Sequence, residues 1–410
     1  YHYTVPEGSY ATNSMGIARI IEFREMVKSL HNMGFRVIMD VVYNHTHQYG
    51  LAKNSVLDKI VPGYYHRLNP VSGEVEQSTC YTCGNTATER VMMAKLMNDS
   101  LVTWAKEYKV DGFRFDLMGH QPKQAMLKAR EAVRAVDPDT YFYGEGWNFG
   151  EVANNSRFVQ ASQLELGGSE IGTFSDRLRD AVRGPGNNTR DSQGIGNGLF
   201  TLPNEKQQQD KSLQHYQLAM DQLRIGLAGN LAHFQLGNKL GKDIPYGDQP
   251  TGYALDPADT INYVSKHDNE SLWDQLQFNL PFATSMEDRV RAQNVSQSIV
   301  LLSQGIPFLQ MGGDFLRSKS LDRNTYDAGD WFNKVDYTMN SNNWNVGLPL
   351  DKGGRSDQDL VSLASSQYTS VGMSDMMFAS NVFNEFLSIR QSSPLFKLTT
   401  AQSVIDRIGF

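Results

Sequence analysis

Hydrophobic and polar positions along the chain repeat as one unit, in which an amphipathic helical stretch is followed by a short apolar strand that ends in polar residues. Residues 16–33 place aliphatic side chains at helical spacing, and Gly34 ends the predicted helix. Residues 35–45, FRVIMDVVYNH, then have the apolar composition of a buried strand. This succession predicts a βα unit.

The same unit recurs later in the sequence. Further helices are predicted over residues 88–108, 122–136 and 380–391, and further strands over residues 110–120, 140–147, 260–269 and 305–316. Strands that alternate with helices indicate a parallel sheet, and strands that are apolar on both faces suit a sheet covered by helices. The pattern therefore predicts an α/β fold.

Two parallel-sheet architectures compete at this point. A doubly wound sheet would carry a glycine-rich phosphate-binding turn after an early strand, and the sequence has none. A barrel places reactive residues at the C-terminal ends of several strands, which is the pattern here. We therefore predict a (β/α)8 TIM-type barrel over residues 1–391. Residues 392–410 resemble the opening strand of a C-terminal β-sandwich domain.

Three long segments interrupt the alternation. Residues 46–87, 186–250 and 321–360 are too long for simple βα connections and are rich in glycine, amide or aromatic residues. We interpret them as loops that wall the active-site face of the barrel.

Composition narrows the class of protein. The chain has 410 residues, of which 40% are hydrophobic and 20% charged, as in ordinary globular enzymes. A formal net charge of −7 without a basic stripe argues against nucleic acid as a partner. No apolar run approaches the roughly 18 residues that span a bilayer, so no membrane partner is expected. The opening YHYTVPEGSY has neither an initiator methionine nor a signal peptide, so we expect a fragment or a processed chain.

Cys80 and Cys83 are the two cysteines of the chain, spaced C-x-x-C in a polar loop. One such pair is half of a zinc site at best, and no second pair follows. A local disulfide, in an exported protein, and two inert thiols, in an intracellular one, both stay open at this stage.

Ionisable groups gather at four predicted strand ends. They are Asp40 with Asn44 and His45, Arg114 with Asp116, Glu145, and His267 with Asp268. Asp116 and Glu145 are 29 residues apart, close to the ~30 of one βαβ repeat. Neighbouring strands would bring both carboxyls to one cleft, and this spacing is compatible with the short separation (roughly 5 Å) that a retaining glycosidase needs.

Each group has a chemical reason to be there. Arg114 lies two residues before Asp116 on the same strand face and would hold the pKa of this nucleophile down. Glu145 has glycine and aromatic neighbours that would desolvate it, as a general acid requires. Asp268 could grip sugar hydroxyls, and Trp147 offers a flat face for a sugar ring.

Taken singly, these residues have simpler explanations. An aspartate at a strand end is more often a cap or a salt-bridge partner than a catalyst, and Asp40, Asn44 and His45 alone would be loop anchors. Trp147 alone would be a packing residue. Four strand ends that all carry carboxylates or imidazoles are costly to bury for stability alone, so the set as a whole favours function.

At these residues the chain resembles the α-amylase superfamily, glycoside hydrolase family 13. Its four signature regions match DVVYNH (40–45), GFRFDLMGH (112–120), GEGW (144–147) and YVSKHDN (263–269). SVLDKIVPGYYHR (55–67) and FLRSKSLDRNTYDAGDWFN (315–333) resemble the branch of type I pullulanases and limit dextrinases. The resemblance implies a retaining hydrolase of α-1,6 branch linkages in pullulan, amylopectin and limit dextrins.

The resemblance also implies roles for the residues. Asp116 would be the nucleophile, Glu145 the general acid/base and Asp268 the stabiliser of the transition state. Contacts to the sugar are implied for His45, Arg114, His267 and Trp147, and an organising role in the site for Asp40 and Asn44. No cofactor is required and no metal ligand is assigned; calcium is known in the wider family, but no acidic ligand loop can be picked out here.

Two departures qualify the resemblance. Asn148 follows GEGW where relatives usually carry aspartate. A YNWGYDP type of motif and the first two barrel strands would precede residue 1, so the barrel would be incomplete and the expected partner is the N-terminal segment of the same protein. SKHDN and the cysteine pair favour an extracellular or cell-surface bacterial enzyme over a plastid one.

Alternatives remain on the same sequence evidence. An α-1,4-acting hydrolase or a transglycosylase would share the fold and the three carboxylates, and only loops would distinguish it. A non-catalytic carbohydrate-binding homologue would be expected to have lost a carboxylate or Arg114, and here all are present.

Overall fold

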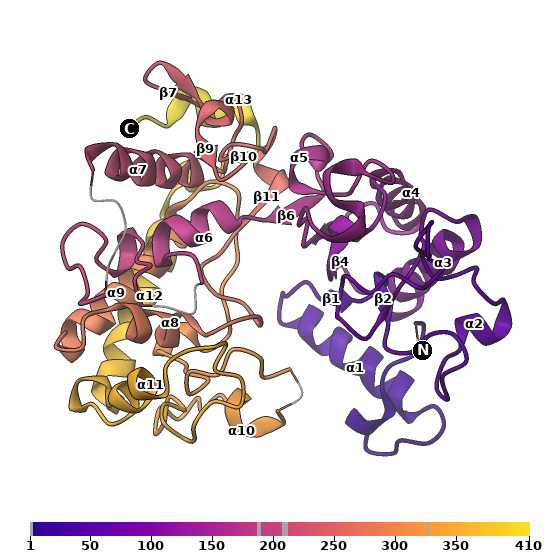
Figure 1. The fold of residues 1–410 in the computed structure, drawn as a ribbon, viewed down its shortest axis with the longest axis horizontal. Helices are drawn as coiled ribbons and strands as arrows, with labels where there is room; N and C mark the ends of the chain where they lie inside the picture. The colour runs from indigo at the N-terminus through magenta and orange to yellow at the C-terminus, as the bar shows by residue number, and fades with distance from the viewer. Residues whose placement is uncertain (1–2, 187–189, 207–211, 327) are drawn as a thin grey trace. The chain divides into compact units, whose positions relative to one another are not determined.

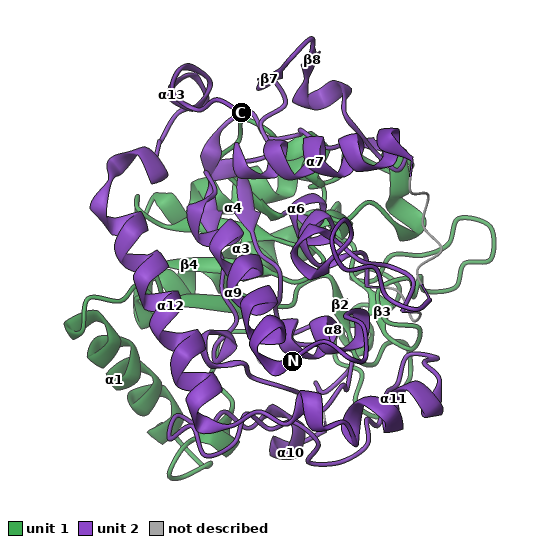
Figure 2. Ribbon diagram, turned by 90° about the vertical axis from the view of Figure 1, so that its left-hand side faces the viewer, with its two compact units in different colours: residues 1–174 green, residues 175–410 purple. Residues whose placement is uncertain are grey.

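The computed structural model describes residues 3–186, 190–206, 212–326 and 328–410, which form two compact units, residues 1–174 and 175–410 (Figure 1, Figure 2). Parallel strands and many helices in both units make this an α/β protein, as predicted. Within the described residues, no helix is both long enough and apolar enough to cross a membrane.

The first unit contains four strands in one parallel sheet, in the order β1-β4-β5-β6. These strands are β1 Ile38–Val41, β4 Gly112–Phe115, β5 Tyr141–Gly144 and β6 Gly172–Phe174. The longer helices of this unit are α1 Ala18–Asn32, α3 Val91–Tyr108 and α4 Lys123–Arg134. The shorter elements are α2 Leu57–Ile60, α5 Gln163–Leu166, and the antiparallel pair β2 His45–Thr46 with β3 Gly84–Asn85.

Burial explains why β4 lies inside the sheet of the first unit. All four of its residues are buried, and Phe113 and Phe115 pack with Phe142 of β5 and with Trp104 of α3 in one hydrophobic core. Burial along the whole strand is typical of a strand that is covered on both faces, and Arg114 is the one charged residue of β4. The predicted strands were longer than the observed ones, because the polar residues at their C-terminal ends leave the sheet and form the site.

The second unit is mainly helical, with short strands. Its helices are α6 Asp176–Arg183, α7 Leu213–Leu227, α8 Leu272–Asn279, α9 Met286–Leu302, α10 Asp330–Asn333, α11 Asp357–Ala364, α12 Met373–Ser392 and α13 Ala401–Arg407. The strands β11 Thr260–Asn262 and β12 Ile306–Pro307 pair in parallel, and two hairpins join β7 Gln235–Leu236 to β8 Lys239–Leu240 and β9 Pro245–Tyr246 to β10 Gln249–Pro250.

One predicted loop contains a helix. Residues 186–250 include α7, whose first turn is capped by the Ser212 side chain accepting from the His215 backbone. Leu223 of α7 packs in a buried cluster with Leu178 of α6. Polar residues before and within the helix hid its narrow apolar stripe, so the sequence interpretation of this stretch as a loop is wrong.

The segment 392–410 is also helical where a strand was expected. Pro394–Phe396 forms a 3-10 turn, and α13 begins after Thr400, whose side chain accepts from the Ser403 backbone. Val404 is fully buried with residues that include Ile225 of the same unit. The predicted opening strand of a β domain is therefore wrong for these residues, because capping and tertiary packing favour helix.

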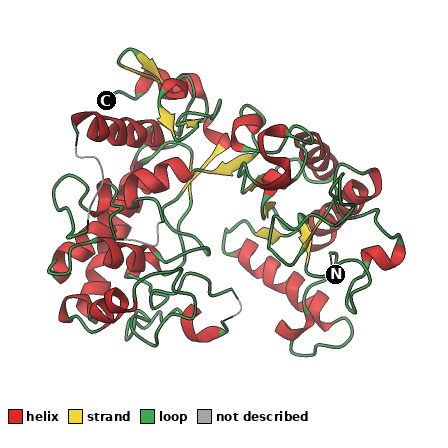
Figure 3. Cartoon of the chain, in the orientation of Figure 1, coloured by secondary structure: helices red, strands yellow, loops and turns green. Residues whose placement is uncertain are grey.

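The long predicted loops otherwise remain largely irregular (Figure 3). In residues 46–87, Cys80 and Cys83 form a disulfide, which decides between the two states that the sequence left open. In residues 321–360, the part that the structure describes contains the short helix α10 and the start of α11 and is otherwise irregular.

Candidate active site

Three parallel strands bring the site residues of the first unit to one end of the sheet. Asp40 of β1, Arg114 of β4 and Tyr143 of β5 are in register. Asp116 lies two residues after Arg114, and Glu145 lies two residues after Tyr143, so both are just beyond the ends of β4 and β5. Since side chains alternate along a strand, residues two apart share a face, as the sequence predicted for these carboxylates.

The Arg114 guanidinium contacts three carboxylates at once. Its Nη1 donates to Asp40 Oδ1 at 2.8 Å and to Asp116 Oδ1 at 3.2 Å, and its Nη2 lies 2.6 Å from Glu145 Oε1. A carboxylate oxygen of Asp116 lies within 4.8 Å of one of Glu145. The side chains of Arg114 and Glu145 are 7% and 2% exposed, so these charges are largely withdrawn from water. The sequence-predicted neighbours on β4 and β5 are therefore brought together.

Glu145 is fixed from several directions. Its Oε2 accepts from the backbone N–H of Leu117 at 3.1 Å, and its own carbonyl accepts from Gly119 at 2.9 Å. Leu117 has a positive φ of 40°, which is uncommon for a leucine. A side chain on Gly119 would collide with the backbone of Trp147, so this turn requires glycine.

Asp116 does not have the depressed pKa expected from its arginine neighbour. Burial and the charge of Glu145 raise the pKa of Asp116 to about 6, and the lowering by Arg114 is smaller than these two effects together. The sequence interpretation counted one cation and missed that the same cation is shared with two further carboxylates. The raised pKa of Asp116 therefore reflects its burial and its closeness to a second carboxylate.

Asn44 and His45 form a local pair beside the strand ends. Asn44 Nδ2 lies 2.9 Å from His45 Nδ1, and the Asn44 carbonyl accepts from the Thr86 backbone at 2.9 Å. His45 pairs with Asn85 in the short β2–β3 ladder. Burial and the neighbouring His47 lower the pKa of His45. A neutral imidazole held in this way can hydrogen-bond a neutral ligand such as a sugar.

Trp147 and Asn148 open the loop after β5. Trp147 is partly exposed, and its backbone closely approaches Gly119. Asn148 Nδ2 donates to Asn154 Oδ1 at 2.8 Å, and the Asn154 backbone donates back to Asn148 Oδ1 at 2.7 Å. The unusual asparagine therefore closes the loop on itself.

A second buried charge cluster was missed by the sequence analysis. Arg67 Nη1 donates to Glu151 Oε1 at 2.7 Å, and the Arg67 Nε donates to Glu89 at 3.0 Å. Ser78 also donates to Glu151, and its hydroxyl lies 3.0 Å from His120 Nε2. The loop carrying Arg67 and Ser78 is thus tied to the segments after β4 and β5. The available signal in the sequence was Arg67, a charged residue in the predicted loop 46–87.

His267 and Asp268 belong to the second unit and follow β11. Lys266 Nζ donates to Asp268 Oδ2 at 2.6 Å, and His267 Nε2 lies 3.3 Å from Asp268 Oδ1. Lys319 Nζ donates to the His267 carbonyl at 3.1 Å. The two lysines are buried and were not predicted, although the sequence SKHDN places Lys266 beside the imidazole and the carboxylate.

The cysteine pair does not form a metal site with His45. Ligand atoms of His45, Cys80 and Cys83 lie within 4.8 Å of one another. Both sulfurs are joined in the disulfide and cannot act as thiolates. A single imidazole remains, which is too few ligands for a structural zinc site.

Comparison with known proteins gives a consistent result. A family model described as alpha-1,6-glucosidases, pullulanase-type, C-terminal, matches residues 339–410. The pullulanase of Klebsiella aerogenes is 47% identical over 100% of this chain, which covers 38% of that protein. The chloroplastic pullulanase 1 of Arabidopsis thaliana is 44% identical over 99% of this chain and 44% of its own length.

Solved structures agree with the sequence comparison. The maltotriose complex of PulA from Klebsiella pneumoniae superimposes with a TM-score of 0.92 at 46% identity, covering 98% of this chain and 44% of that one. The chain thus spans less than half the length of these relatives. On the agreement of its whole sequence and of its fold with these proteins, the chain belongs to the pullulanase family.

Proposed function

We propose that this chain carries catalytic residues of a debranching enzyme that hydrolyses α-1,6-glucosidic linkages in pullulan, amylopectin and limit dextrins. The observation that carries the proposal is the contact of one buried arginine, Arg114, with Asp40, Asp116 and Glu145. The choice of the α-1,6 linkage is supported by the matched family model, whose description names α-1,6-glucosidases.

The proposed reaction proceeds with retention of anomeric configuration. Asp116 attacks the anomeric carbon while Glu145 protonates the departing glycosidic oxygen, which gives a glycosyl ester on Asp116 and a free sugar hydroxyl. Glu145 then takes a proton from a water molecule as the water oxygen attacks the anomeric carbon. The bond from this carbon to Asp116 breaks, which regenerates the Asp116 carboxylate and the protonated Glu145. A separation within 4.8 Å between oxygens of the two carboxylates suits this double displacement rather than an inverting one.

Proton placement limits this reaction. Asp116 has to be ionised and Glu145 protonated, whereas burial and the nearby Glu145 raise the pKa of Asp116 to about 6. The reactive form is the one in which Asp116 is ionised and the transferable proton is on Glu145. Arg114 favours an ionised Asp116 and would keep stabilising this charge until the bond to the sugar forms.

The remaining predicted residues complete the proposal. Asp268 stabilises the oxocarbenium-like transition state, His45 and His267 bind hydroxyls of the sugar at the cleavage point, and Trp147 stacks on the acceptor side. No cofactor is needed for this acid–base chemistry.

We also propose that the parallel strands are part of a (β/α)8 barrel in the complete protein. The strand β1 ends the β1-β4-β5-β6 order, and its Ile38 and the following Val42 are 37% and 44% exposed. Ile21, on α1, is also exposed, although the helix was expected to bury its apolar stripe. Exposed apolar positions on an edge strand favour pairing with further chain. A cooperative melt of residues 1–410 as a monomer would contradict this part of the proposal.

Product analysis tests the proposed activity. Pullulan is incubated with residues 1–410 and, in parallel, with the complete gene product, and the released sugars are identified. Maltotriose alone establishes α-1,6 cleavage, whereas panose or isopanose moves the protein to α-1,4 cleavage. Absence of products from both proteins overturns the proposal.

Stereochemistry is tested separately. Proton NMR of the first released sugar distinguishes α from β anomers before mutarotation. The double displacement predicts the α anomer first, and an initial β anomer would show inversion and remove the nucleophile role from Asp116.

A further inference from the structure

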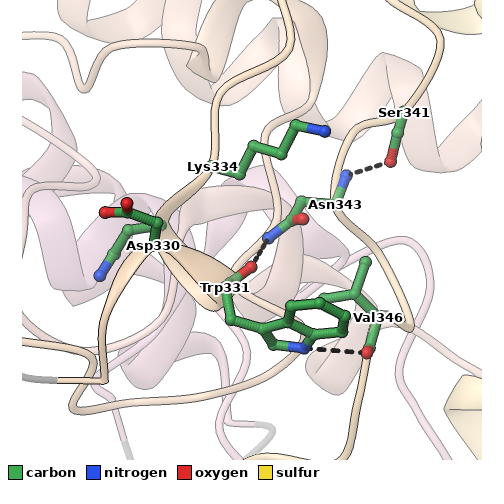
Figure 4. A pocket seen from close by; sticks show the side chains of 7 residues that line it. Asp330, Trp331, Lys334, Ser341, Asn343 and Val346 are labelled. Atoms are coloured by element: carbon green, nitrogen blue, oxygen red, sulfur yellow. Dashed lines mark hydrogen bonds between the residues drawn. The ribbon is translucent and has the colours of Figure 1, made fainter.

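A pocket of about 540 Å3 lies in the second unit, and its lining contains none of the residues proposed for hydrolysis (Figure 4). It is formed by α10 and the loop that follows, and its lining residues include Asp330, Trp331, Lys334, Asn343 and Val346. Its volume is within the range of sites that hold small molecules, roughly 300–1,000 Å3. None of these residues has a part in the proposed hydrolysis.

Trp331 is held at the surface rather than buried. Its indole Nε1–H donates to the Val346 carbonyl at 3.0 Å, and its own carbonyl accepts from Asn343 Nδ2 at 3.2 Å. The side chain is nevertheless 65% exposed, which is unusual for so large an apolar group. A fixed aromatic ring with a free face loses little conformational entropy when a ligand stacks on it.

Polar groups surround the indole on a rigid frame. Asn343 is buried and also donates to the Phe332 carbonyl at 3.1 Å, while the Asn333 side chain is paired with Thr325. In the view of Figure 4, Lys334 lies on the opposite side of the pocket from the indole. The frame is therefore formed before any ligand binds.

Charge and shape define the ligand. Asp330 and Lys334 are exposed and carry one negative and one positive charge, so the rim is neutral as a whole and offers both an acceptor and a donor. A ligand with an apolar ring face and hydroxyl groups along its edge matches this arrangement. A phosphate or another strongly charged ligand would be repelled by whichever of the two rim charges has its own sign.

We propose that this pocket is a second binding site for a neutral α-glucan chain, with the indole of Trp331 stacked on a glucose ring. The proposal rests on the proposed function, which makes α-glucans the substrate. Such a site would hold a polymer near the enzyme without taking part in cleavage, so it would act on long chains and leave short substrates unaffected.

The test is affinity electrophoresis of the complete gene product in gels with increasing amylopectin. All proteins carry Glu145→Gln to prevent hydrolysis of the polymer. Trp331→Ala is expected to raise the apparent dissociation constant roughly threefold to tenfold, the size of one aromatic stacking contact. Trp331→Phe should keep most of the retention. Tyr326→Ala is the matched control, since Tyr326 is an 82% exposed aromatic on the same loop and does not line the pocket.

Kinetics without the Glu145 substitution complete the test. Trp331→Ala is expected to raise KM for amylopectin and to leave kcat/KM for a short α-1,6-branched oligosaccharide unchanged, which also shows that the variant folds. Equal retention of Trp331→Ala and the parent overturns the glucan site. A changed melting temperature with unchanged retention overturns it too, because Trp331 would then stabilise the fold and not bind glucan.

A milder variant covers the case in which Trp331→Ala does not fold. Asp330→Ala removes an exposed rim group and is expected to weaken retention without lowering the melting temperature. Unchanged retention of this folded variant contradicts the proposal. If the unsubstituted protein does not hydrolyse pullulan, the proposed function is overturned. Retention of that protein and its Trp331 variant by amylopectin would still test the second site.

Discussion

Two buried arginine–carboxylate clusters of the first unit are built from the same groups and behave in opposite ways. At Arg114, burial and the charge of Glu145 raise the pKa of Asp116 to about 6. At Arg67, hydrogen bonds from Ser78, Arg67 and Asn85 outweigh burial and lower the pKa of Glu151 to about 2. The number of donors facing each carboxylate accounts for the difference.

The difference separates a reactive cluster from a structural one. Glu151 accepts from three side chains, so its charge is fully compensated and it ties loops together. Asp116 accepts from Arg114 at 3.2 Å and faces another carboxylate, which leaves its charge poorly compensated. Reactive carboxylates in enzymes are commonly kept in such unsatisfied surroundings.

The largest expected effect is on catalysis. Asp116→Asn in the complete protein should lower kcat on pullulan by several orders of magnitude, because no covalent intermediate can form. Glu151→Gln should leave kcat far less affected. Stopped assays on both variants measure the contrast, and near-normal turnover by Asp116→Asn would remove its role as nucleophile.

The second effect is on stability. Glu151→Gln leaves the buried Arg67 without its closest charge partner and should lower the free energy of unfolding by roughly 3–5 kcal/mol. Glu89→Gln is the control, since Glu89 contacts the same arginine but is 31% exposed, and should cost clearly less. Urea denaturation measures both. Equal losses would mean that burial of Glu151 is not what matters.

The pH dependence of stability should have opposite signs at the two clusters. Glu151 has a lowered pKa, so its contribution of about 3 kcal/mol is present above its unfolded pKa and is lost as pH falls from about 4.5 to about 2. Asp116 has a raised pKa, so the native state loses about 3 kcal/mol as pH rises from about 4 to about 6.

The free energy of unfolding of Asp116→Asn and Glu151→Gln, measured as a function of pH, tests these two opposite trends. Relative to the parent, Asp116→Asn should gain stability between pH 4 and pH 7, and Glu151→Gln should lose its disadvantage towards pH 2. Parallel curves for the two variants would contradict the comparison. Activity should also fall as pH drops below about 6, where Asp116 becomes protonated.

The smallest effect concerns one donor of the structural cluster. Ser78→Ala removes a hydrogen bond to Glu151 and should cost about 1.5–3 kcal/mol, because the bond involves a charged acceptor. It should also raise the pKa of Glu151 and shift the acid unfolding midpoint upward. An unchanged midpoint would show that Arg67 and Asn85 alone set this pKa.

Parts of the fold could be predicted because the residues that decide them are local. Helix α1 ends at Asn32, just before the left-handed Gly34, and α3, α4 and β4 lie within their predicted ranges. Helices α7 and α13 were not predicted, since the residues they pack against, Leu178 for α7 and Ile225 for α13, are distant in the sequence.

The sequence by itself determined the alternation of helix and strand, the carboxylates at the ends of β4 and β5, and the family to which the chain belongs. Tertiary structure alone decided that Arg114 is shared among three carboxylates, that Cys80 and Cys83 are joined, and that Trp331 stands at a pocket. The physical reason is range: periodicity and strand ends depend on neighbouring residues, whereas a pKa or a pocket depends on side chains that only the fold brings together.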